Sequence, residues 1–212
     1  MKKLLFVLFA MLIASPLIAA NPAGTSSIGI FGSYGYTMTS GDLIVPSSSY
    51  SVESKNGAAY DIGAQFNYFV ADDSALVFFG SYAYSPMFFA YTHNTTPANN
   101  IDITIKSSFI EFGAGYRGYS GDFFWGVGLY YGLKNGDWNA TSSGETEKID
   151  SSLTKNVFGL LLELGYAIPL SDTVSFDLLF KAKLSLGYAF EDDPEKLKSN
   201  SFLLGGALTF KL

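Results

Sequence analysis

Residues 157–188 read VFGLLLELGYAIPLSDTVSFDLLFKAKLSLGY. Two runs of alternate apolar side chains occupy this stretch: Phe158, Leu160, Leu162, Leu164, Tyr166 and Ile168, then Val174, Phe176, Leu178, Phe180, Ala182, Leu184, Leu186 and Tyr188. A period of two over this length predicts two β-strands that each have one apolar face. The sequence Leu-Ser-Asp-Thr at 170–173 predicts a tight turn between them. The stretch therefore predicts a long antiparallel hairpin.

The same period of two continues through the chain on both sides of this hairpin. Apolar faces lie within residues 28–38, 60–70, 76–84, 110–116, 123–133 and 202–212. No segment after residue 20 sustains the 3.6-residue period of a helix. Tight turns are expected at 71–74, 119–122 and 170–173, and long polar loops at 39–58, 86–101, 135–153 and 191–200. This alternation predicts an all-β fold, an eight-stranded antiparallel up-and-down barrel with its short turns at one end.

Two segments depart from the regular pattern. The apolar side chains fall on odd-numbered residues between Ile101 and Ile105 but on even-numbered residues between Ile110 and Tyr116. Either a bulge near Ser107-Ser108 resets the phase, or the strand leaves the membrane there. Residues 87–91, Met-Phe-Phe-Ala-Tyr, are unusually apolar for a loop. They could extend the preceding strand, fold over the mouth or form an apolar contact patch, and we expect an extension of the strand.

The distribution of charge indicates which face of the barrel meets lipid. The apolar faces contain no charged or amide side chain, whereas the opposite faces carry Asp61, Gln65, Asn67, Glu111, Arg117, Lys134, Glu163, Asp177, Lys181, Lys183, Lys211 and many glycines. Because Lys or Arg at the lipid midplane costs ~2–4 kcal/mol, uncharged faces on all strands predict a transmembrane barrel with a narrow polar lumen. A soluble carrier with an apolar interior is the alternative. Tyrosine and tryptophan near the strand ends also suit the membrane interface.

The N-terminus has the layout of a secretory signal peptide. Lys2 and Lys3 precede an apolar run over 4–13, and small residues end at Ala20. We expect residues 1–20 to be a cleaved signal peptide and 21–212 to be the barrel domain.

The signal peptide, the eight strands and the last strand together resemble the small outer-membrane barrel family of the OmpA transmembrane domain, OmpX and Ail. The last strand resembles a C-terminal assembly signal, with apolar residues at Phe202, Leu204, Leu208, Phe210 and Leu212, although it ends on leucine rather than on an aromatic residue. The resemblance implies location in a bacterial outer membrane, a monomer, and outer-membrane lipid and the barrel assembly machinery as partners. We expect no peptidoglycan-binding domain after the barrel.

Seven ionisable residues are predicted to face the lumen as a charge network: Asp61, Glu111, Arg117, Glu163, Asp177, Lys181 and Lys183. The 170–173 turn places Glu163 opposite Lys181, and counting from the short turns puts Glu111, Glu163 and Lys181 at similar heights. The network is either a gate of a narrow pore or a structural plug in which buried charges pair with one another. We expect a plug.

Composition excludes several kinds of chemistry. The chain has 212 residues, a formal charge of -6, no cysteine and one histidine, so thiol catalysis and nucleic-acid binding are not expected. His93 lies in a predicted loop, and the acidic clusters Asp72-Asp73 and 191–195 lack calcium-loop spacing. We expect no metal or cofactor. We expect a non-enzymatic protein with a membrane-integrity or surface-interaction role through four long loops that contact an extracellular ligand. The alternatives are a narrow channel for small or hydrophobic solutes, as in OmpW-like barrels, and a lipid-A-modifying enzyme.

Overall fold

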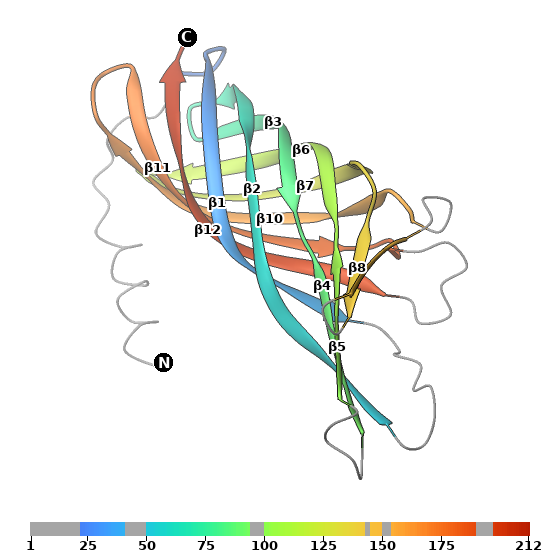
Figure 1. The fold of residues 1–212 in the computed structure, drawn as a ribbon. Coiled ribbons are helices and arrows are strands. Elements are labelled where there is room, and N and C mark those ends of the chain that lie inside the picture. Colours follow the sequence, from blue (N-terminus) through green and yellow to red (C-terminus); the bar gives the residue numbers. More distant parts are fainter. Residues whose placement is uncertain (1–21, 41–49, 94–99, 143–144, 150–153, 190–196) are drawn as a thin grey trace, which may run out of the picture.

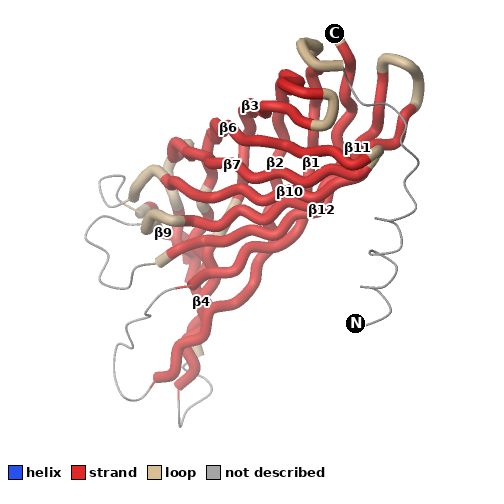
Figure 2. Tube along the Cα trace, turned by 180° about the vertical axis from the view of Figure 1, so that it is seen from behind, coloured by secondary structure: helices blue, strands red, loops and turns tan. Residues whose placement is uncertain are grey.

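The computed structural model describes residues 22–40, 50–93, 100–142, 145–149, 154–189 and 197–212, where all regular elements are β-strands (Figures 1 and 2). Eight strands pair antiparallel in the order β1–β2–β3–β6–β7–β10–β11–β12, and β12 pairs with β1 to close a barrel. Their bounds are β1 (Ser26–Ser40), β2 (Tyr50–Ala71), β3 (Ser74–Tyr84), β6 (Ser108–Ser120), β7 (Phe123–Lys134), β10 (Val157–Pro169), β11 (Val174–Ser185) and β12 (Lys198–Lys211). The predicted barrel is confirmed. The predicted signal peptide lies outside the described residues, in which no helix is long and apolar enough to cross a bilayer.

The strands are strongly tilted relative to the barrel axis. A line of directly paired residues, one on each strand, shows this tilt. It starts at Ser27 on β1 and passes through Asn67, Val77, Gly115, Gly128, Leu161, Lys183 and Ser201. It returns to β1 at Thr37, ten residues beyond the start. Because tilt and stagger are linked in a closed sheet, residues that pair directly on neighbouring strands do not lie at equal heights. The expectation that Glu111, Glu163 and Lys181 lie at similar heights stays a prediction.

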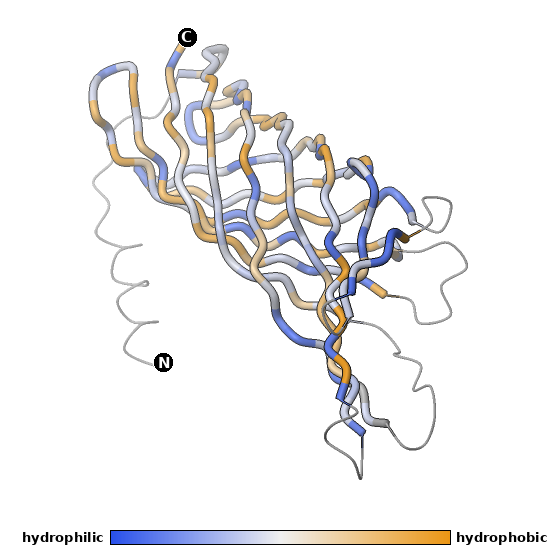
Figure 3. Tube along the Cα trace, viewed as in Figure 1, coloured by the Kyte–Doolittle hydropathy of each residue, from blue (hydrophilic) through white to orange (hydrophobic). Residues whose placement is uncertain are grey.

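The two faces of the wall differ as the alternation predicts. Side chains such as Ile30, Ile62 and Leu204 point outward and are more than 60% exposed, whereas the polar side chains between them are buried. Figure 3 shows apolar and polar positions alternating along the strands. Lumen-facing glycines give room for large neighbours, because a Cβ on Gly165 would meet the ring of Phe124. The lumen is therefore a packed interior.

A second, smaller sheet extends the wall beyond the barrel on one side. The N-terminal part of β2 pairs with β4 (Met87–His93), followed by β5 (Ile101–Lys106), β8 (Asn139–Ser142) and β9 (Glu145–Lys148). We call these strands, with residues 50–55 of β2, the outer sheet; it lies at the end opposite the short turns (Figure 1). The expectation of long polar loops at 39–58, 86–101 and 135–153 is therefore wrong for the residues that these strands occupy. Backbone pairing between neighbouring loops converts parts of them into strands.

The two irregular segments connect the barrel with the outer sheet. Strand pairing breaks at Ser107, between β5 and β6, where the change of phase predicts a bulge. The apolar residues 87–91 form most of β4, which extends the hairpin strand as expected. Met87 and Phe89 are nevertheless buried, and they pack on residues at the barrel mouth. The segment therefore both extends the wall and covers the mouth.

Candidate functional site

A lower set of lumen contacts centres on Arg117 of β6. Its Nη2 donates to Oε2 of Glu163 at 2.8 Å and to Oε1 of Gln65 at 3.3 Å. The guanidinium carbon lies 4.5 Å from the centre of the Phe124 ring. Arg117 is only 1% exposed, so its charge depends on these partners rather than on bulk water.

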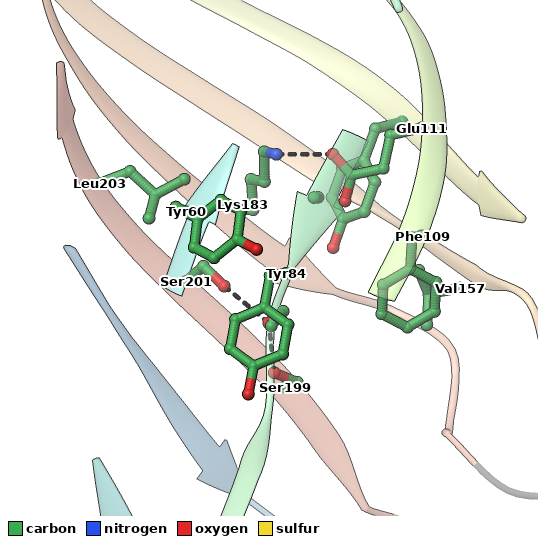
Figure 4. Close-up of a pocket in the computed structure, with 12 residues that line it drawn as sticks. Tyr60, Tyr84, Phe109, Glu111, Val157, Lys183, Ser199, Ser201 and Leu203 are labelled. Carbon is green, nitrogen blue, oxygen red and sulfur yellow. Dashed lines mark hydrogen bonds and ion pairs between the residues drawn. The ribbon is translucent and has the colours of Figure 1, made fainter. Parts of the chain in front are cut away.

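An upper set of lumen contacts centres on Lys183 of β11. Its Nζ lies 2.5 Å from Oε2 of Glu111 and 2.7 Å from Oδ2 of Asp61. The same Asp61 oxygen lies 3.4 Å from Nζ of Lys181, which lies 3.4 Å above the Phe31 ring centre. Figure 4 shows the Lys183–Glu111 pair. Four strands, β2, β6, β10 and β11, thus contribute all the ion-paired groups of both sets, which would resist separation of the wall.

The structure places all seven predicted residues of the charge network in the lumen, but it pairs them differently from the simplest expectation. Glu163 does lie opposite Lys181 in the β10–β11 register. Its ion pair, however, is with Arg117 two strands away, because the strand tilt brings β6 and β10 together across the narrow interior. Asp177 accepts hydrogen bonds from Ser175 and Thr209 at 2.9 and 2.8 Å. Asp177 therefore binds hydroxyl groups of its own strand and of β12.

Apolar side chains close the lumen above and below the charges. The lower cluster consists of Phe31, Phe124, Leu179 and Ala207. The mouth cluster consists of Met87, Phe89, Phe109, Tyr130, Trp138, Val157, Leu161, Ala189 and Leu197. A cavity between the charges and the mouth cluster, which we call the upper cavity, has a free volume of about 20 Å³ (Figure 4). That volume holds about one water molecule.

Hydroxyl groups line the upper cavity on the side away from Glu111. Ser85 Oγ lies 2.8 Å from Ser199 Oγ and 2.9 Å from Ser201 Oγ, and Thr37 Oγ1 lies 2.6 Å from Ser199 Oγ. We call these four residues the hydroxyl latch. They join the end of β3 to β1 and β12 across the mouth. Sequence reasoning missed this group and the buried Trp138, because isolated serine, threonine and tryptophan residues in polar segments give no periodic signal.

The other predicted features lie apart from the lumen. His93 ends β4 in the outer sheet, where its backbone N–H donates to Asn100 Oδ1 at 2.9 Å. Asp72 at a short turn accepts a hydrogen bond from the backbone N–H of Ala23, and the acidic cluster 191–195 lies outside the described residues. Over the described ranges, no three potential ligands among His, Asp and Glu gather at one point.

The last strand, β12, has the orientation expected of its alternation. Leu204 and Phe210 point outward, and their side chains are 67% and 38% exposed. Leu203 and Ala207, which alternate with them, are buried in the lumen. The assembly-signal residues Phe202, Leu204, Leu208, Phe210 and Leu212 therefore share the outward register, while their recognition by the assembly machinery stays a prediction.

The closed barrel, its apolar outer face and its charged interior define the class of protein. Rings at both ends of the outward face are in contact, with Tyr60 and Tyr84 stacked at 5.2 Å and Tyr116 and Trp125 at 5.8 Å. Aromatic rings that flank an apolar band around a polar lumen are typical of outer-membrane barrels. The protein is an eight-stranded outer-membrane β-barrel, with the architecture of the small barrels that the sequence resembles.

Several solved outer-membrane barrels are similar to this chain. Neisserial surface protein A is 13% identical, with a TM-score of 0.45 over 90% of this chain and 98% of that chain. Ail, the attachment invasion locus protein of Yersinia pestis, is 16% identical in its complex with the heparin analogue sucrose octasulfate, with a TM-score of 0.40 over 89% and 99%. The N-terminal β-barrel domain of Pseudomonas aeruginosa OprF is 12% identical, with a TM-score of 0.44 over 90% and 98%. No protein-family model and no curated protein matches the chain.

Proposed function

We propose that this barrel is a non-enzymatic, non-conducting membrane anchor that presents the outer sheet at the cell surface. The observation that supports this role most is the closed lumen, in which ion-paired residues lie between two apolar clusters. In a barrel without an open pore, the polar groups that a partner can reach lie outside the membrane. In the described chain, these groups lie on the outer sheet.

The outer sheet has a surface suited to transient polar contact. All four residues of β9 are exposed, with the sequence Glu-Thr-Glu-Lys. Lys55 pairs with Asp102 and Lys148 with Asp137, both at 2.8 Å and on the exposed surface. Such exposed pairs contribute little to stability, ~0–1 kcal/mol each, and so remain available to a partner. The proposal includes a monomeric barrel in lipid and a contact partner at this sheet.

Planar-bilayer conductance of the refolded barrel tests the closed lumen. We expect no discrete current steps from the wild-type protein, once circular dichroism and a heat-dependent gel shift show that it is folded. We also expect a silent but less stable Lys181→Met variant, because the lysine helps to neutralise buried Asp61. Discrete steps from the wild type would favour the narrow channel. Steps that appear only in Lys181→Met would make the network a gate and overturn the plug.

A further inference from the structure

Among the described residues, four of the places where the outer sheet joins the barrel have a distinctive local feature. The β3–β4 connection contains Ser85-Pro86, and the β5–β6 connection contains Ser107. The β7–β8 connection contains Gly136, which has a φ of 71°. The fourth place is Gly57 within β2, where a Cβ would collide with the ring of Phe88. Three of these places therefore separate two strands, whereas β2 continues through the boundary at Gly57.

Two of these connections are bonded directly to each other. The backbone N–H of Ser85 donates to the Ser107 carbonyl at 3.1 Å, and Ser107 Oγ donates to the Ser85 carbonyl at 2.5 Å. The pairing register with β2 also changes there, since Tyr60 pairs with Tyr84 whereas Lys55 pairs with Phe88. The four residues of β2 from Asn56 to Ala59 therefore lie opposite only three residues, 85–87, of the neighbouring segment. This mutual bond can act as one pivot for the β4–β5 hairpin.

The outer sheet closes the mouth through side chains near this pivot. Met87 and Phe89 of β4 pack with Phe109 and Tyr130 of the barrel in the mouth cluster. Trp138, directly before β8, meets Phe109 edge-on with ring centres 5.4 Å apart and is only 2% exposed. The upper cavity lies beneath, with Ala83, Glu111 and Lys183 in its lining.

We propose that the outer sheet is a lid that turns about these four connections and opens the upper cavity to the extracellular side. The hydroxyl latch holds the pivot closed, because Ser85 is bound to Ser199 and Ser201 on β12. The lower ion pairs and the lower cluster stay in place when the lid opens. The cavity is thus a one-ended chamber with Lys183 and Glu111 at its floor. This inference goes beyond surface presentation and does not depend on it.

Cysteine labelling tests the lid cleanly, because the chain contains no cysteine of its own. Ala83→Cys places a reporter in the upper cavity, where the native side chain is 3% exposed. Ser33→Cys places a second reporter deeper in the lumen, and Ser51→Cys an exposed one on the outer sheet. The rate of reaction with a small charged maleimide is measured on each folded variant in detergent micelles.

The lid predicts a specific pattern of rates. Trp138→Ala, which removes the largest buried side chain of the mouth cluster, should label Ala83→Cys at least tenfold faster without changing Ser33→Cys. The matched control Phe124→Ala, in the lower cluster, should leave Ala83→Cys unchanged. A Ser85→Cys/Ser199→Cys disulfide should stop the labelling of Ala83→Cys, and a reductant should restore it. Ser51→Cys should react quickly in all backgrounds.

Two results would overturn the lid. If Trp138→Ala and the disulfide both leave the Ala83→Cys rate unchanged, the outer sheet is a fixed cover. If Ser33→Cys reacts as fast as Ala83→Cys, the whole barrel opens rather than the lid. Bilayer conductance tests whether the whole lumen is closed, and the labelling rates test whether the lid opens. The two tests are independent, because the lower half of the lumen stays closed when the lid opens.

Discussion

Lys183 forms ion pairs with both acidic residues of the upper lumen, Asp61 and Glu111. Its side chain is 5% exposed, and theirs are 1% and 4% exposed, so water cannot replace it. Replacing the lysine leaves buried Glu111 without its ion pair and leaves Asp61 with only the longer pair to Lys181. The cost of an uncompensated buried charge exceeds the worth of the pair itself, which makes this residue a sensitive point.

We therefore expect Lys183→Met to lower the free energy of unfolding by about 3–5 kcal/mol. The measurement is urea unfolding of the refolded barrel in lipid, followed by tryptophan fluorescence. Lys148→Met is the matched control, because it removes a 2.8 Å ion pair whose side chains are 62% and 52% exposed. The control should cost at most ~1 kcal/mol. Equal losses in the two variants would show that the lumen charges are hydrated.

For the single residues of the lumen, the sequence predicts which side chains face inward but not which of them form ion pairs. Alternation along a strand fixes the side of each residue, so all seven charged positions are placed correctly in the lumen. The Arg117–Glu163 pair joins strands that are not neighbours, and its formation depends on the stagger around the whole barrel. A hairpin register alone contains no information on that stagger.

Strands β6 and β10 show how small residues allow a wall to close tightly around large ones. Gly113 lies under the ring of Phe79, and Gly165 lies under the ring of Phe124. Gly32 differs, because it faces outward and no atom would lie within 4 Å of an added Cβ. Gly165 and Gly32 therefore have opposite tolerance for a methyl group.

We expect Gly165→Ala to destabilise the barrel by ~1–3 kcal/mol, because Phe124 must leave its position to admit the methyl group. Gly32→Ala should change stability by no more than about 0.5 kcal/mol. Urea midpoints of both variants with unchanged slopes are the measurement. A neutral Gly165→Ala would mean that the lower cluster can repack without cost.

The elements of the barrel are predictable from sequence, and those of the outer sheet largely are not. Each barrel strand repeats its apolar alternation over many residues, as from Val174 to Ser185. Strands β8 and β9 have four residues each, mostly polar, and β9 is exposed along its whole length. They form because the neighbouring β5 offers a hydrogen-bonding edge, and that edge exists only in the folded molecule.

The described part of the molecule consists of one closed sheet and one open sheet that share strand β2. The closed sheet has no free edge within the membrane, which satisfies the backbone hydrogen bonds in lipid. The open sheet ends at β9, whose charged residues protect an exposed edge from pairing with other chains. The division of β2 between the two sheets therefore follows the boundary between lipid and water.

The outward apolar positions of β1 also set the thickness of bilayer that the barrel fits. They run from Ile28 to Met38, between Ser26 and Ser40 at the strand ends. Ten residues of strand cover about 33 Å, and a tilt of about 40° reduces this to about 25 Å along the membrane normal. Hydrophobic matching then favours bilayers with short acyl chains. Folding yield, measured by gel shift in vesicles of increasing chain length, should fall once the hydrocarbon core exceeds about 30 Å, since longer lipids must thin locally around the protein.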